Sequence, residues 1–141
     1  MSVYIPVALR RQVRLDAKMR CGYCLSSEAV IGIALEIEHI HPTSLGGETV
    51  RQNLWLACHR CNQCKNNRIR AVDPVTQEEV ALFNPRIQSW QDHFGWDNSN
   101  TQIIGRSASG RATVTALQMN DEYVVQSRRF WVILGIHPPV E

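Results

Sequence analysis

The stretch EIEHIHPTSLGGETVRQNLWLACHRCNQCK, residues 36–65, decides the fold of this chain. Its first residues, together with the β-branched run before them, alternate apolar and acidic side chains and predict a strand over residues 33–40. Pro42 and the glycine pair that follows predict a loop. The run LWL then predicts a short strand or a turn into Cys58, and the segment after Cys61 predicts a short basic helix. The order strand, loop, strand, helix indicates a mixed α+β fold.

The rest of the chain predicts further helices and strands. Pro6 can start a helix, and apolar residues four apart predict an amphipathic helix that ends at Arg20. Aromatic residues between positions 83 and 96 predict strands and turns. A helical stretch is expected up to Met119, followed by a last helix that Asn120 or Asp121 caps and that runs to about Leu134.

Length and composition fit one compact domain, because 141 residues with 44% hydrophobic content can bury a core. We expect a single domain over residues 1–141, with a core at 20–70 and a C-terminal α/β extension at 71–141 that packs on it. The sequence contains no run of eighteen apolar residues, and its N-terminus turns basic before any long apolar segment. We therefore expect no membrane span, no secretory signal and a cytoplasmic protein.

The charge is distributed unevenly along the chain. Residues 1–70 contain ten Lys or Arg and five acidic residues, whereas residues 71–141 contain five and eight. The net charges of the two halves are therefore +5 and −3, which add to the +2 of the whole chain. The basic half also contains all the cysteines, which suggests a polyanionic partner for that half.

The cysteines indicate a metal site. They are Cys21, Cys24, Cys58, Cys61 and Cys64. In a cytoplasmic chain, the two CxxC pairs that the first four form favour metal over disulfides, and four thiolates can complete a tetrahedral structural zinc site. Reduced, buried thiols are the alternative. Cys64 is either a competing ligand or a free helix cysteine, and His59, between two cysteines, stays open as an alternative metal ligand.

These motifs together resemble the cysteine-flanked form of the HNH endonuclease family. The matching elements are CGYC at 21–24, the acid–histidine pair at 38–39, Pro42, Gly46–Gly47, NL at 53–54 and CHRCNQCK at 58–65. The resemblance covers roughly residues 20–68. It implies a ββα-metal core, in which two antiparallel strands and a helix clamp one divalent cation. The four-cysteine zinc site would stabilise this core. The N-terminal helix and the C-terminal extension would be additions to the core.

The resemblance also implies roles for four residues. His39 matches the general base, and Asn53 matches the residue that holds the loop and orients the base. Glu38 and Asn62 match the ligands of the catalytic cation. This chain has glutamate at position 38 where aspartate is frequent, which leaves the position and preference of the cation open.

The chemistry of phosphodiester hydrolysis requires these residue types. A hard cation, Mg²⁺ or alternatively Mn²⁺ or another divalent ion, neutralises the phosphate and stabilises the leaving oxygen. A neutral His39 can take a proton from the attacking water. Adjacent residues of a regular strand point to opposite faces, so Glu38 and His39 can reach one site only if the strand ends, twists or bulges there. Pro42 and the loop that follows lead us to expect such an irregularity.

The sequence thus predicts a DNA endonuclease or nickase, and two other classes stay open. One is a non-catalytic zinc-containing nucleic-acid-binding module, and the other is a structural or partner-binding zinc protein. Lys65, Arg68 and Arg70 either bind DNA phosphates or form a solvated basic face. A monomer would nick one strand and a homodimer could cut both, and the sequence does not choose between them.

Overall fold

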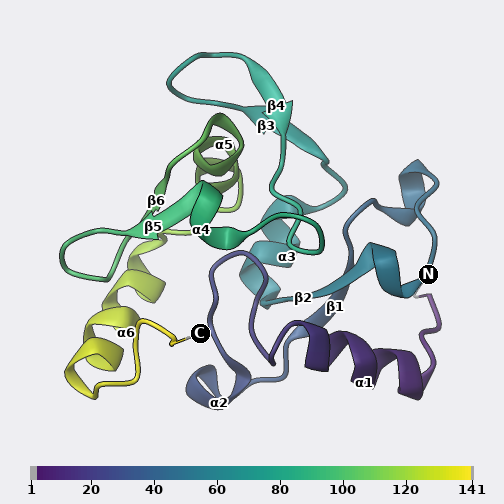
Figure 1. Ribbon diagram of the computed structural model, residues 1–141, viewed down its shortest axis with the longest axis horizontal. Coiled ribbons are helices and arrows are strands. Elements are labelled where there is room, and N and C mark those ends of the chain that lie inside the picture. The colour runs from purple at the N-terminus through teal and green to yellow at the C-terminus, as the bar shows by residue number, and fades with distance from the viewer. Residues whose placement is uncertain (1–2, 141) are drawn as a thin grey trace. The chain divides into compact units, whose positions relative to one another are not determined.

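The computed structural model describes residues 3–140, which form two compact units (Figure 1). Unit 1 contains the residues up to Ile69 together with Asn84–Gln88, and unit 2 contains Arg70–Phe83 and the residues from Ser89 onward. Helices and short antiparallel strands occur in both, which confirms the α+β prediction. That residues 71–141 pack on the core as part of one domain stays a prediction. No helix of residues 3–140 has the length and apolar character needed to cross a bilayer.

Unit 1 is a layered arrangement around one strand pair. Its elements are α1 (Val7–Asp16), α2 (Glu28–Ile31), β1 (Glu36–His39), the 3₁₀ turns η1 (Thr43–Leu45) and η2 (Arg51–Asn53), β2 (Leu54–Ala57) and α3 (His59–Lys65). β1 and β2 pair antiparallel from Glu36↔Ala57 to His39↔Leu54. One face of the pair packs Ile37 and Leu54 against Val13 of α1, and α3 contacts β1 from the other face. The predicted strand–loop–strand–helix order is therefore present.

Two elements of unit 1 are shorter than the sequence predicts. α1 ends at Asp16 instead of Arg20 because Lys18 and Met19 adopt positive φ, which no helix continues through. β1 starts at Glu36 instead of residue 33, and the chain before it leaves α2 through Gly32, which adopts positive φ. The side chain of Ser27 caps α2 by accepting from a backbone N–H of its first turn.

Residues 84–88 return to unit 1 through Arg86. Its guanidinium donates to Asp16 Oδ2 at 2.9 Å and to the carbonyl oxygen of Leu54 at 2.9 Å. It also stacks over the ring of Trp55, 4.6 Å from the ring centroid. This segment therefore clamps the end of α1 to the start of β2.

The described residues of unit 2 form two hairpins and three helices. Its elements are β3 (Arg70–Val72), β4 (Glu79–Ala81), α4 (Trp90–His93), β5 (Phe94–Trp96), β6 (Ile103–Gly105), α5 (Ala108–Ala116) and α6 (Glu122–Ile133). β3 pairs with β4, and β5 pairs with β6. Asp73, in the turn after β3, accepts two hydrogen bonds from Arg111 of α5, at 3.0 and 2.7 Å. Asp121 caps α6 as predicted.

Candidate functional site

Four cysteine thiols gather in the interior of unit 1. The Sγ atoms of Cys21, Cys24, Cys58 and Cys61 all lie within 4.8 Å of one another, and all four residues are buried. Cys24 Sγ and Cys58 Sγ are 3.7 Å apart. Thiolates at about 2.3 Å from a tetrahedral zinc lie about 3.8 Å from each other, so the cluster has the dimensions of a zinc site. The four cysteines can therefore hold a structural metal ion, as the spacing predicts.

Two backbone features bring the cysteine pairs together. Cys58 is the N-cap of α3, so the first turn of this helix presents Cys61 beside it. The first pair is held against β2, because Gly22 N–H donates to the carbonyl oxygen of Leu56 at 2.9 Å. A Cβ on Gly22 would lie 2.3 Å from Trp55 Cδ1, so this close approach requires glycine.

The two open candidates for metal ligation lie outside this cluster. Cys64 is half-buried and is not among the clustered thiols of the described residues. The His59 ring points to a different partner, with Nδ1 2.7 Å from Glu36 Oε2. The four-thiolate set is thus complete without either residue.

Glu38 and His39 leave β1 on opposite faces. The pairing of β1 with β2 is regular through both residues, and the strand ends at His39 without a bulge. The Glu38 side chain is 3% exposed and points to the interior, whereas His39 is half-buried on the face that packs on α1. The structure therefore differs from the expectation that both side chains reach one site.

Glu38 contacts a tyrosine and a lysine. Tyr23 OH donates to Glu38 Oε1, while Oε2 is buried without a hydrogen-bond donor from the described residues. Lys65 Nζ lies 4.0 Å from Oε2 and donates to the carbonyl oxygen of Ile40 at 2.9 Å. Burial raises the pKa of Glu38 to about 7, although the Lys65 charge and the Tyr23 hydrogen bond oppose it.

The ammonium of Lys65 is consequently an internal cation. The residue is 2% exposed and sits in the last turn of α3, with its side chain directed at the end of β1. Burial lowers the pKa of Lys65, and the Glu38 charge works against that shift. An ammonium in this position is not available on the surface for a phosphate, so we leave Lys65 out of the proposed nucleic-acid contacts.

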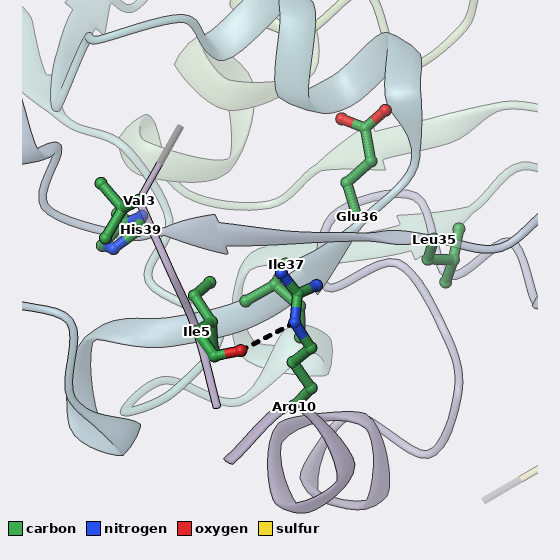
Figure 2. Close-up of a pocket in the computed structure, with 7 residues that line it drawn as sticks. All are labelled: Val3, Ile5, Arg10, Leu35, Glu36, Ile37 and His39. Atoms are coloured by element: carbon green, nitrogen blue, oxygen red, sulfur yellow. Dashed lines mark hydrogen bonds between the residues drawn. The ribbon is translucent and has the colours of Figure 1, made fainter. Parts of the chain in front are cut away.

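His39 is one of the residues that line a pocket. The pocket has a volume of about 440 Å³ and includes Arg10, Glu36 and His39 in its lining (Figure 2). His39 Nε2 lies 2.9 Å from Thr49 Oγ1, which fixes the orientation of the ring. Burial lowers the pKa of His39, and the positive charge of Lys65 lowers it further. Both effects favour the neutral form of the imidazole, which can accept a proton.

Asn53 closes the loop that follows His39. Its Oδ1 accepts from His41 N–H at 2.8 Å, and its Nδ2 donates to the carbonyl oxygens of His41 and Glu48 at 2.9 and 2.8 Å. His41 Nε2 in turn lies 3.0 Å from the carbonyl oxygen of Leu45. Asn53 thus ties both ends of the loop together, which is the kind of contact a loop-holding residue needs.

Asn62 lies beside Glu36, and no hydrogen bond in the described part of the chain joins it to Glu38. Asn62 Nδ2 donates to Glu36 Oε1 at 2.7 Å, and His59 occupies the other oxygen of the same carboxylate. Burial raises the pKa of Glu36, but the hydrogen bonds from Asn62 and His59 outweigh it, so the pKa lies below its usual value. Glu36 is therefore an ionised carboxylate next to the predicted ligand Asn62.

The two predicted DNA-contacting arginines lie on the surface. Arg68 is exposed in unit 1, where Nη2 donates to the carbonyl oxygen of Cys64 at 2.6 Å. Arg70 is exposed in unit 2 and pairs with Glu79, with 3.1 Å between Nε and Oε1. Both guanidinium groups are accessible, and their binding of nucleic acid stays a prediction.

Sequence reasoning did not assign four residues that shape this region. They are Arg10, Tyr23, Glu36 and Thr49. A signal existed for Glu36, because the two-residue period of a strand places it on the same face as Glu38. No local signal indicates that Tyr23 or Thr49 contacts β1, since both contacts depend on the tertiary fold.

Comparison with known proteins finds a family that this region resembles. Residues 21–68 match the family model described as HNH endonuclease, which covers 48 of the 141 residues. No curated protein and no solved structure matches the chain. The matched segment contains the four clustered cysteines, β1, the loop held by Asn53, β2 and α3. Residues 21–68 thus resemble the HNH endonuclease family, and the likeness is limited to this segment.

Proposed function

We propose that this protein is a divalent-cation-dependent endonuclease or nickase that hydrolyses phosphodiester bonds in DNA, with His39 as the general base. The observation that carries the proposal is the position of His39. It stands half-buried at the end of β1, beside a pocket of about 440 Å³, with its ring fixed by Thr49. A base in this position needs to be neutral and correctly oriented before water arrives.

The proton transfer follows from the state of this imidazole. A neutral His39 accepts a proton from a water molecule in the pocket, and the resulting hydroxide attacks the phosphorus in line with the leaving 3′-oxygen. The loop tied by Asn53 keeps the backbone after His39 in place. The products have 5′-phosphate and 3′-hydroxyl ends, as the family resemblance implies.

The donor groups near β1 and α3 fit a hard divalent cation. Carboxylate and amide oxygens are its preferred ligands, and Glu38 Oε2 is buried without a hydrogen-bond donor from the described residues. The resemblance assigns Glu38 and Asn62 as the ligand pair, with Mg²⁺ as the expected ion. When bound, such an ion supplies Lewis-acid stabilisation of the charge on the phosphate. In the structure Glu38 and Asn62 contact different partners, Lys65 and Glu36 respectively.

The basic surface of unit 1 supports DNA as the polyanion. Arg10 lines the same pocket as His39, and its Nε donates to the carbonyl oxygen of Ile5 at 3.0 Å. Arg10 is exposed, so its guanidinium is accessible to a phosphate at this pocket. Arg10 and Arg68 are therefore the residues of unit 1 that we propose to contact DNA phosphates, with Arg70 as a further contact from unit 2.

The second candidate is a zinc-containing nucleic-acid-binding module without catalysis. The burial of Lys65 beside Glu38 favours it, because an internal ammonium adjoins the carboxylate that the family pattern assigns to the cation. Such a module would bind DNA through the same arginines but would leave it intact. A cleavage assay separates the two candidates.

The test uses zinc-loaded protein and supercoiled plasmid in the presence of Mg²⁺, Mn²⁺, Zn²⁺ or EDTA. We expect nicking that EDTA abolishes and that His39→Ala lowers by about 100-fold or more, with circular dichroism and zinc content unchanged. Gln63→Ala, at an exposed position of α3, is the control and should cleave normally. Nicking at the wild-type rate by His39→Ala would refute the base assignment. DNA binding without any nicking would favour the second candidate.

A further inference from the structure

The last helix of unit 2 carries large apolar side chains on its outward side. α6 lies beside the β5–β6 hairpin (Figure 1). Tyr123, Phe130, Ile133 and Leu134, the last of which is the C-cap residue, are 73, 59, 79 and 70% exposed. Phe130 follows Tyr123 by seven residues, and Ile133 and Leu134 follow Phe130 by three and four, so all four lie on one side of the helix. We call these four residues the outer face of α6.

The opposite side of α6 buries an arginine. Arg128 is fully buried, and its guanidinium donates to the carbonyl oxygens of Thr101 at 2.9 Å and Met119 at 2.8 Å. It also lies over the ring of Trp96, 5.3 Å from the ring centroid. A helix on the surface of a monomer normally turns its apolar residues toward the core and its arginines toward water. α6 reverses this arrangement, so we expect another surface to cover its outer face.

The area of this apolar surface suits a protein interface. Ile136 extends the outer face, because its N–H donates to the carbonyl oxygen of Trp131 at 3.0 Å and keeps it at the end of the helix. Ile136 is 48% exposed. With roughly 200 Å² for each fully exposed residue of this size, the outer face and Ile136 together present about 650 Å². The largest apolar patch of a typical monomer has about 300–600 Å², and each partner in a standard interface contributes about 800 Å².

The charges of α6 favour a second copy of the chain as the partner. The exposed residues of the helix include one acid, Glu122, and one cation, Arg129. A nucleic acid or an anionic lipid surface requires an excess of cations, which one acid and one cation do not supply. A face without net charge can lie against an identical face without repulsion, which is what a two-fold symmetric contact requires.

We propose that the outer face of α6 binds the same face of a second copy, so that the protein is a two-fold symmetric homodimer. The partner copy buries the apolar side chains that α6 turns outward. The interface is independent of the proposed function, because none of its residues belongs to the region around His39. It also assigns two copies of His39 to one assembly.

The test measures the molar mass of the zinc-loaded protein by sedimentation equilibrium at micromolar concentrations. We expect twice the mass of one chain for the wild type. Phe130→Lys and Ile133→Lys should each raise the dissociation constant by about 100-fold or more, because each places an ammonium inside the apolar contact. A lysine in the last turns of a helix is favourable, so both variants should keep their fold. Circular dichroism and thermal unfolding check the fold, and if one variant fails to fold, the other decides.

Ile87→Lys is the matched control. Ile87 is 78% exposed in unit 1, close to the 79% of Ile133, and its replacement should leave the dimer intact. Three results would overturn the interface: a wild type that stays monomeric, a dimer that persists in both lysine variants of α6, or an equal loss of dimer in Ile87→Lys.

A monomeric wild type would point to one of two other occupants, and each has its own signature. Binding to phosphatidylglycerol vesicles that Phe130→Lys abolishes would replace the second copy by a lipid surface. A lower unfolding temperature in Ile133→Lys than in Ile87→Lys, without vesicle binding, would show that the outer face packs against its own chain.

Discussion

Gly47 lies so close to His41 that a Cβ on the glycine would be 1.8 Å from the carbonyl oxygen of His41. The same carbonyl accepts a hydrogen bond from Asn53 Nδ2 at 2.9 Å. The loop after His39 is therefore packed backbone against backbone, and one glycine and one asparagine maintain it. This arrangement explains the glycine at position 47 by space rather than by backbone dihedral angle.

Replacement of Gly47 by alanine should displace the loop. We expect Gly47→Ala to lower plasmid nicking by about tenfold or more and to reduce stability by about 1–3 kcal/mol, because the backbone on the other side cannot move away freely. The matched control is Gly46→Ala. Gly46 has φ +90° but no heavy atom within 4 Å of an added Cβ, so it introduces backbone strain without a clash. If both variants nick equally well, the close packing has no role in activity.

Loss of one clustered cysteine should release the structural metal. We expect Cys21→Ser to contain no stoichiometric zinc and to lose cooperative unfolding, since binding and folding of such a site are coupled. Cys64→Ser is the control, because Cys64 is outside the cluster, and it should keep one zinc per chain. Elemental analysis and thermal unfolding provide the two measurements. A stable, zinc-free Cys21→Ser protein would refute the structural role.

The Lys65–Glu38 pair predicts a stability pattern that surface pairs do not show. Lys65→Met should cost about 3 kcal/mol, because it leaves the Glu38 carboxylate buried without its nearby cation. The double variant Lys65→Met/Glu38→Gln should recover part of that loss, and Arg11→Met, at an exposed position, should change stability by less than about 0.5 kcal/mol. Urea unfolding measures all three. Equal losses in the single and double variants would show that the two residues are not coupled.

The pH dependence of cleavage should follow His39. Its pKa is lowered by burial and by Lys65, so the acid limb of the rate profile should have a midpoint below the ordinary histidine value of about 6.5. Activity is lost as the pH falls, because the protonated ring accepts no proton. Protonation is easier in the unfolded chain, so His39 also contributes stability at higher pH that is lost as the pH falls through this range. A midpoint above 6.5 would contradict this account.

Much of unit 1 could be predicted from local sequence. The CxxC spacing gave the metal ligands, and the order of β1, β2 and α3 followed from alternation, loop residues and the basic segment. The burial of Lys65 could also have been predicted from the sequence. It lies four residues after Cys61 on the same helix, so a buried Cys61 places Lys65 on the buried face.

The contacts of the acidic residues could not be predicted in the same way. Alternation along β1 puts Glu36 and Glu38 on one face, but only the tertiary fold determines that Tyr23 covers one and that Asn62 reaches the other. The expectation that Glu38 and His39 converge came from family resemblance. The regular register of β1 keeps them apart, which is what the two-residue period of a strand requires.

The clamp formed by Arg86 has a consequence for the order in which the protein can fold during synthesis. Its partners Asp16 and Leu54 are made long before it, and Arg70–Phe83 of unit 2 is made in between. During synthesis, the contacts of Arg86 with α1 and β2 can therefore form only after residues 84–88 have left the ribosome. The first unit to start folding is thus unable to finish before part of the second has emerged.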